Sequence, residues 1–269
     1  MHAKVRQPAV AGRFYPSDPR VLREEVDSYL VAGDPAEAAI GCIVPHAGYM
    51  YSGHVAGAVY SRIEIPARCI LLCPNHTGMG RPLAITSEGA WDTPLGRVPI
   101  DEELAAALQQ KFTFLNEDAE AHRSEHAVEV QLPFLQERRK DFSFVPIALG
   151  TGQYEMLEAL GAALGEVIQK LGPALLIASS DMNHYENDHI TRIKDHKALK
   201  PIRALDPRGL FDVVTKEEVS MCGFGPAVAM LTAARRLGAV HAEVIKYATS
   251  GDVSGDRDLV VGYAGVIVR

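Results

Sequence analysis

Short apolar runs alternate with longer stretches of helical periodicity along most of the chain. Apolar runs of roughly four to eight residues, bounded by Gly, Pro or polar residues, are typical of buried strands. This pattern predicts strands at 40–45, 68–74, 142–149, 174–178, 241–248 and 259–268, and a strand-and-turn region at 84–98.

Apolar residues recur at helical spacing between these strands. They predict helices at 18–30, 54–62, 101–112, 125–139, 154–171, 191–205, 209–214 and 226–237. Ser17 or Asp18 suits the N-cap of the first helix, and Gly33 suits its end. Pro133 is expected to kink the helix at 125–139 or to start a new segment there.

Strands that alternate with helices predict an α/β fold whose parallel or mixed central sheet is covered on both faces. A chain of 269 residues is within the size of one such domain. No internal repeat, low-complexity tract or long linker divides the chain, so we predict a single domain over 1–269.

The net charge of the chain indicates which partners it is not expected to bind without specific recognition. The formal net charge is −7, which disfavours non-specific binding to nucleic acid or to an anionic membrane, because both need a basic surface. No segment reaches the roughly 18 uninterrupted apolar residues of a membrane helix. The N-terminal stretch 1–14 lacks the apolar core of a secretory signal. We therefore expect a cytoplasmic protein that binds neither nucleic acid nor membrane.

Chemically reactive residues stand where predicted strands end. His46 and His76 follow the strands at 40–45 and 68–74. In an open α/β sheet, ligands bind in the crevice beyond the carboxyl ends of the strands. Because adjacent parallel strands lie about 4.8 Å apart, two histidines at such ends can reach one metal ion. The alternatives for His46 are a general base or a structural role.

Cys222 differs from the other three cysteines, which we expect to pack as small hydrophobes in predicted strands. It precedes a predicted helix, where unpaired N–H groups and the helix dipole favour a thiolate. His46, His76 and Cys222 form a candidate site for one iron, copper or zinc ion, because imidazole suits all three and thiolate favours the softer ones. The competing interpretation is that Cys222 packs against its turn.

Two further polar groups are candidates for chemistry. Asp181 and His184 follow the strand at 174–178, where the imidazole can transfer protons and the carboxylate can position it. Equally, the polar residues at 179–183 can cap the next helix. His126 and Glu129 are expected on one helix face beside Glu125, as metal ligands, as support for the pocket or as a solvated face. The remaining histidines are expected to be structural or surface residues: His2, His54, His122, His189, His196 and His241.

No phosphate-binding loop, dinucleotide-binding fingerprint, serine-hydrolase elbow or HExxH zinc helix is present in the sequence. Several short motifs together resemble the Memo family in order and spacing, from about residue 8 to the C-terminus. They are Ala9-Val10-Ala11-Gly12-Arg13-Phe14-Tyr15-Pro16, Pro45-His46-Ala47-Gly48-Tyr49, Pro74-Asn75-His76-Thr77-Gly78, Thr93-Pro94-Leu95-Gly96, Glu125-His126-Ala127-Val128-Glu129-Val130-Gln131-Leu132-Pro133, Ser179-Ser180-Asp181-Met182-Asn183-His184-Tyr185, Cys222-Gly223 and Val261-Gly262-Tyr263.

This resemblance implies a fold like that of the class III extradiol dioxygenases, an α/β/α sandwich with one metal pocket. At matching positions it implies His46, His76 and Cys222 as metal ligands, with Asp181 and His184 in the same pocket. The dioxygenases use two histidines and a carboxylate, so a cysteine ligand departs from their pattern, and ring-opening activity does not follow. The resemblance also implies a radical-SAM protein and an AMMECR-type protein as partners.

The leading hypothesis is a metalloprotein with a redox or oxygenase-like role on an unknown small-molecule or peptide substrate. His46, His76 and Cys222 hold the ion, and His184 and Asp181 are the catalytic pair. Glu129 and His126 line or support the pocket, and Tyr49 and Asn75 contact substrate. A second hypothesis is a non-enzymatic module that binds a peptide or protein in the same pocket. A third is a zinc-type hydrolase.

Overall fold

A mixed sheet of nine strands runs through the centre of the protein, counted over residues 4–31 and 35–269, which the computed structural model describes. Its strand order is β10 (His184–Glu186), β12 (Val260–Val268), β2 (Gly41–Val44), β9 (Leu175–Ser179), β3 (Arg68–Pro74), β8 (Ser143–Leu149), β4 (Leu83–Ile85) and β7 (Asn116–Glu117), and β11 (Ala242–Thr249) pairs with β12. The central strands β2, β9, β3 and β8 are parallel. β12 and β4 run antiparallel to β2 and β8, respectively. The predicted α/β fold with a mixed central sheet is confirmed.

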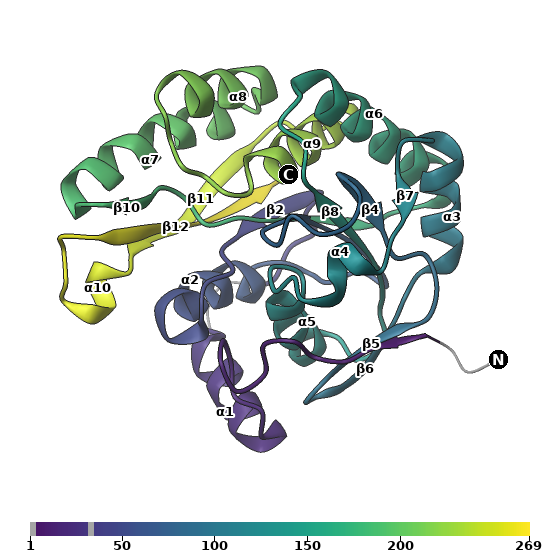
Figure 1. Ribbon diagram of the computed structural model, residues 1–269, viewed down its shortest axis with the longest axis horizontal. Coiled ribbons are helices and arrows are strands. Elements are labelled where there is room, and N and C mark those ends of the chain that lie inside the picture. The colour runs from purple at the N-terminus through teal and green to yellow at the C-terminus, as the bar shows by residue number, and fades with distance from the viewer. Residues whose placement is uncertain (1–3, 32–34) are drawn as a thin grey trace.

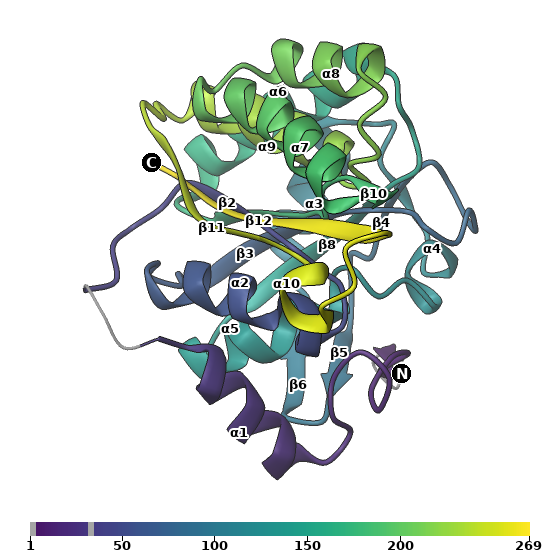
Figure 2. The same cartoon turned by 90° about the vertical axis from the view of Figure 1, so that its left-hand side faces the viewer.

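Helices cover both faces of this sheet (Figures 1 and 2). One layer contains α3 (Glu102–Lys111), α6 (Tyr154–Leu171), α7 (Asp188–Arg203), α8 (Pro207–Lys216) and α9 (Phe224–Arg236). The opposite layer contains α1 (Pro19–Tyr29), α2 (Tyr49–Ser61) and α5 (Leu132–Arg138). Alternate residues of a strand point to opposite faces. Accordingly, Ile43 joins the first core, whereas Cys42 and Val44 join the second.

Smaller elements surround this three-layer sandwich. β1 (Val5–Arg6), β5 (Ala90–Thr93) and β6 (Gly96–Pro99) form a separate three-stranded sheet. The short helices α4 (Glu120–Arg123) and α10 (Gly251–Ser254) and the 3-10 helix η1 (Glu129–Gln131) lie in connections. Of the helices in the described ranges, none is long and apolar enough to cross a membrane.

The second helix begins earlier than predicted. α2 starts at Tyr49 with Gly48 as its N-cap, so Gly53 lies inside the helix and not in a turn. A Cβ on Gly53 would stand 2.5 Å from the ring of Tyr29, and one on Gly57 would overlap the Tyr29 backbone. Both glycines are therefore needed where α1 packs closely against α2, which outweighs their low helix propensity.

Two other expectations are resolved near the site. The predicted helix at 125–139 is a turn, then η1, then α5, and Pro133 lies in the first turn of α5. This agrees with Pro133 starting a new segment. Asn187 caps α7, because its side chain accepts the N–H of Ile190. The residues at 179–183 are not helix caps, so that competing interpretation is wrong. At the first helix, Asp18 is the N-cap, while Gly33 lies outside the described residues, as does His2.

Candidate metal centre

The ends of three neighbouring parallel strands build the candidate site. β9 lies between β2 and β3, and all three run in the same direction. Their carboxyl ends therefore deliver His46, His76 and Asp181 to one edge of the sheet. The N-terminus of α9 brings Cys222 to the same edge. The expected convergence of distant segments is present.

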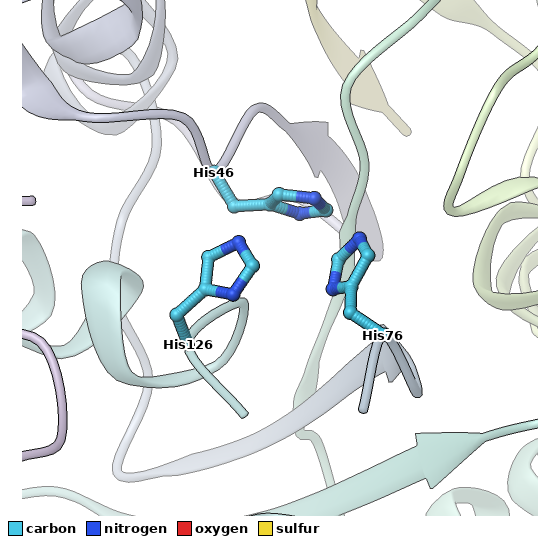
Figure 3. A group of neighbouring side chains, drawn as sticks. All are labelled: His46, His76 and His126. Atoms are coloured by element: carbon cyan, nitrogen blue, oxygen red, sulfur yellow. The ribbon is translucent and has the colours of Figure 1, made fainter. Parts of the chain in front are cut away.

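Three imidazoles meet at this edge, from His46, His76 and His126 (Figure 3). One ligand atom from each lies within 4.8 Å of the others. The ring of His46 is edge-on to His76 and His126, with centroids 5.0 and 5.3 Å away, while His76 and His126 stack at 4.8 Å. His126 contributes from the turn before η1, a third segment.

The hydrogen bonds of His46 fix its neutral tautomer. Its Nδ1 lies 3.0 Å from Ser179 Oγ. That hydroxyl donates its proton to the Ala127 carbonyl at 2.6 Å and accepts from Gln131 Nε2 at 2.9 Å. Ser179 can therefore only accept from His46, so Nδ1 carries the proton and Nε2 carries the lone pair. Burial lowers the pKa of His46 to about 3, with repulsion from His76 adding to it, so the ring is neutral at pH 7.

His76 is oriented by a buried carboxylate. Glu125 accepts the His76 backbone N–H at 2.6 Å and lies 2.9 Å from His76 Nδ1. Burial alone would raise the pKa of Glu125, but the hydrogen bond and charge of His76 overcome it and lower this pKa to about 2. The carboxylate is ionised and accepts a hydrogen bond from His76 Nδ1–H. Nε2 is then the ring nitrogen of His76 that is left to bind an ion. This is the carboxylate–histidine pairing that commonly supports metal ligands.

Cys222 lies against His46, with 3.2 Å between its Sγ and His46 Nε2. Two donors of one tetrahedral ion are separated by roughly 3.3–3.6 Å, given metal–ligand bonds of 2.0–2.3 Å. The expected thiolate at Cys222 is not favoured by its surroundings. Burial, reinforced by the charge of Asp181, raises the pKa of the Cys222 thiol well above its usual range, and this desolvation outweighs the helix dipole.

Asp181 and His184 have separate partners. Asp181 Oδ1 accepts the backbone N–H of His46 at 2.8 Å, so the carboxylate positions His46, although we expected it to position His184. Burial raises the pKa of Asp181, although hydrogen bonding to His46 and the nearby His184 oppose the shift. His184 Nδ1 lies 2.9 Å from the Ser220 carbonyl, which can only accept. His184 Nε2 is therefore the atom left for proton transfer.

His126 lies in the same buried environment, but its contact with Glu125 is longer than that of His76. Burial lowers its pKa to about 4, and the neighbouring His46 adds to the effect. Its Nδ1 is 3.3 Å from Glu125 Oε1. Phe14 packs on its other side, with ring centroids 4.6 Å apart. His126 is thus a neutral imidazole in the wall of the cluster.

The other predicted site residues are structural in their contacts. Glu129 accepts from Arg6, from the Ala9 and Val10 backbones and from Tyr15, so it anchors the N-terminal segment. It does not share a helix face with His126, because His126 precedes η1. The hydroxyl of Tyr49 donates to the Val130 carbonyl inside the core. Asn75 organises its own turn, accepting from Thr77 and Gly78 and donating to Met79.

Two residues that orient the histidines were not assigned this role from the sequence, namely Glu125 and Ser179. Glu125 was part of the predicted polar cluster, but nothing in its spacing connects it to His76. Ser179 is the last residue of β9 and is fully buried. A polar residue at the end of an otherwise apolar run was the available signal.

The donor set fits a transition-metal ion. Nδ1 of His46 and of His76 is hydrogen-bonded to Ser179 and Glu125, so Nε2 is the atom of each ring left for an ion, and the thiol of Cys222 lies against Nε2 of His46. Imidazole and thiolate ligands suit iron, copper and zinc, whereas a calcium or magnesium ion would need several oxygen donors. A three-layer α/β protein with a histidine-rich candidate metal centre at the carboxyl edge of its sheet is the class that fold and site define.

Comparison with known proteins gives the family. A family model described as Memo-like protein matches residues 6–267. MEMO1 family proteins of Methanopyrus kandleri and Aquifex aeolicus are 42% and 43% identical to this chain, and each match covers 98% of this chain and 99% of the relative. The chain belongs to the Memo family. An uncharacterized protein from Escherichia coli K12 shares the fold at a TM-score of 0.57 and 14% identity, covering 84% of this chain and 98% of that protein.

Proposed function

We propose that this Memo family protein binds one transition-metal ion, iron or copper, and uses it in a redox or oxygenase-like reaction. His46 and His76 would hold the ion, with Cys222 as the third ligand. The observation that carries this proposal is the pair of oriented imidazoles. Ser179 and Glu125 each accept a hydrogen bond from an Nδ1–H, so Nε2 is the atom of each ring left to bind an ion at one edge of the sheet.

The separation of Cys222 and His46 supports Cys222 as the third ligand. At 3.2 Å, their donor atoms already lie at about the spacing of two ligands on one ion. By contrast, the ligand nitrogens of His46, His76 and His126 are known only to lie within 4.8 Å of one another. We therefore assign His126 to the wall of the centre, where its neutral ring faces the ion or a substrate.

When bound, such an ion supplies Lewis acidity and, for iron or copper, a change of oxidation state. The chain's own residues supply the rest. His184 keeps Nε2 free to take or give a proton while Ser220 holds its other nitrogen. Asp181 holds the backbone of His46 and lies within 4.0 Å of its Nε2. His46 and Asp181 are buried, whereas Cys222 is partly exposed.

Metal analysis of protein purified without added metal tests the ligand set. We expect about one iron or copper per chain in the wild type and a near-complete loss in a His46→Ala/His76→Ala double variant. A Cys222→Ser variant should bind more weakly and lose the softer copper in preference. The matched control is a His196→Ala/His241→Ala double variant, which removes two exposed histidines outside the site. Equal metal content in the wild type and the His46/His76 variant would refute the ligand assignment.

Oxygen dependence tests the reaction class. Metal-loaded protein screened against small molecules and peptides should consume oxygen with the compound that it turns over, and His184→Gln should slow the consumption while leaving the metal content unchanged. Turnover of esters or amides with zinc and without oxygen would instead support the hydrolase hypothesis.

A second function, peptide binding, is favoured by one feature. A cavity of about 430 Å³ beside the site is lined by Phe14, Tyr15, Met50 and Tyr51, among others. Aromatic and methionine side chains of this kind suit an apolar peptide side chain. Capture of a peptide that survives the His46→Ala/His76→Ala change but is lost in Tyr51→Ala would support this role over catalysis.

A further inference from the structure

A polar network joins two segments that carry residues of the candidate centre. The first segment leads from the end of β9 into the edge strand β10 and contains Asp181 and His184 (Figure 1). The second lies before α9 and contains Cys222. Asn183 and Ser220 connect the two segments through hydrogen bonds. Asn183 is fully buried, whereas Ser220 lies at the surface.

The partners of the Asn183 side chain allow it only one orientation. Its Oδ1 accepts the backbone N–H of Ser220 at 3.1 Å and lies 3.0 Å from the Ser220 hydroxyl. A backbone N–H only donates, so this end of the amide must be the oxygen. The other end, Nδ2, donates to Glu186 at 2.7 Å and to Thr191 at 3.3 Å. All four hydrogen-bonding positions of the side chain are therefore occupied inside the protein.

Ser220 holds both the backbone and the ring of His184. The Ser220 hydroxyl accepts the backbone N–H of His184 at 2.7 Å. The Ser220 carbonyl lies 2.9 Å from His184 Nδ1 and can only accept, so it selects the tautomer with the proton on Nδ1. Because Asn183 binds the N–H of Ser220, it fixes the residue whose carbonyl makes this selection.

The backbone around His184 is irregular at the same place. β10 pairs with β12 with a shift of register between His184 and Glu186. Tyr185, between them, has a φ of 60°, in the left-handed region that a bulky side chain rarely adopts. Irregularities of this kind direct side chains beside functional sites, and they persist only where surrounding contacts hold them. The contacts of Asn183 and Ser220 flank this irregularity and hold it.

We propose that Asn183 and Ser220 form a positioning clamp, which keeps the proton of the neutral His184 ring on Nδ1 and leaves Nε2 to accept a proton. This inference rests on the proposed function, in which His184 transfers a proton beside the ion. The charge of His184 acts on both His46 and Asp181, which is consistent with a position next to the centre. Asn183 and Ser220 act through His184 and are positioning residues.

The tautomer of His184 can be measured from the nitrogen chemical shifts of its imidazole ring by NMR, with His184→Gln to assign the signals. The sample is the full chain at alkaline pH, where imidazoles are neutral, treated with a chelator so that no paramagnetic ion broadens the signals. We expect the form with the proton on Nδ1 to predominate in the wild type. Asn183→Ala should lower the ratio of this form to the Nε2–H form about two- to tenfold, as expected for the loss of one hydrogen bond.

The matched control is Thr191→Val. It removes a different partner of the Asn183 amide in the same buried network and leaves Ser220 untouched. Both Asn183→Ala and Thr191→Val should unfold at a lower urea concentration than the wild type, but only Asn183→Ala should change the tautomer ratio. An equal change of the ratio in both variants would show a merely structural role for Asn183 and would overturn the proposal.

A surface variant decides the matter if Asn183→Ala does not fold. Ser220→Ala removes the hydroxyl that holds the His184 backbone and contacts Asn183, so the ratio should fall in the same direction. An unchanged ratio in the variant that folds would refute the clamp and would leave the proposed metal binding standing. Conversely, wild-type protein without iron or copper would contradict the proposed function, but the tautomer ratio would still test the clamp, because it is measured without the ion.

Discussion

A buried aspartate beside the candidate centre leads to a quantitative prediction about pH. Asp195 on α7 is fully buried. Its carboxylate accepts the Asn183 backbone N–H at 2.8 Å and the Tyr247 hydroxyl at 2.7 Å. Burial raises the pKa of Asp195 from 3.8 to about 7, although both hydrogen bonds and the nearby Arg192 act to lower it.

The raised pKa makes the folded state less stable as the pH rises. Between pH 3.8 and about 7, folded Asp195 keeps a proton that the unfolded chain has released. A displacement of about three pH units, at about 1.4 kcal/mol each, means that ionisation costs about 4 kcal/mol of folding free energy in total. From about pH 5 to about pH 8 the loss is about 2–3 kcal/mol. The full loss of folding free energy is reached only at pH values above the pKa of Asp195 in the folded protein.

The variant Asp195→Asn removes this cost. Its side-chain carbonyl can still accept from Asn183, and its amide can donate to the Tyr247 oxygen. Urea unfolding at a series of pH values should therefore show that the free energy of unfolding of Asp195→Asn gains about 2–3 kcal/mol on that of the wild type between about pH 5 and about pH 8.

The matched control is Asp188→Asn on the same helix. The hydrogen bond and charge of Arg192 hold the pKa of Asp188 at about 2 despite partial burial, so it is ionised throughout this range. The difference between Asp188→Asn and the wild type should stay constant with pH. Parallel stability profiles for the wild type and Asp195→Asn would refute the reasoning, because they would show that Asp195 ionises without cost in the folded protein.

Three further substitutions test how the histidines and the cysteine are held. Glu125→Gln removes the carboxylate that orients His76, and a chelator competition assay should show metal affinity lower by about 10- to 100-fold. Ser179→Ala removes the acceptor of the His46 Nδ1 proton and leaves buried partners unsatisfied, so urea unfolding should show a loss of about 1–3 kcal/mol. Gly223→Ala places a Cβ against the backbone and side chain at the end of β9, and thermal unfolding should show a lower melting temperature together with reduced metal content.

The layered fold could be predicted because its strands are long apolar runs. β3 and α6 have the predicted bounds, since each is bordered by proline, glycine or polar residues that act locally. The start of α2 could not be predicted in this way. Gly53 resembles a turn residue in sequence, and only the contact with Tyr29 from another helix explains it.

The residues of the candidate site also differ in whether the sequence could predict their positions. The residues at strand ends converge because the topology of parallel strands places them together, and topology follows from the order of apolar runs. The partner of His76 lies 49 residues away in a turn, where no periodicity operates. We predicted His122 to be a surface residue, which is wrong, because it is buried. The reason is related: α4 is only four residues long, too short for a buried face to appear as a pattern.

The protonation states of the candidate ligands determine how metal affinity should depend on pH. Two neutral imidazoles, His46 and His126, have pKa values that burial lowers to about 3 and about 4, while burial raises the pKa of the Cys222 thiol. Glu125 is held ionised by its hydrogen bond with His76, which lowers its pKa to about 2. A metal ligand must be deprotonated. Cys222 can therefore join His46 on an ion only by losing its proton, so its contribution to affinity must increase with pH, whereas that of His46 must stay constant above about pH 4.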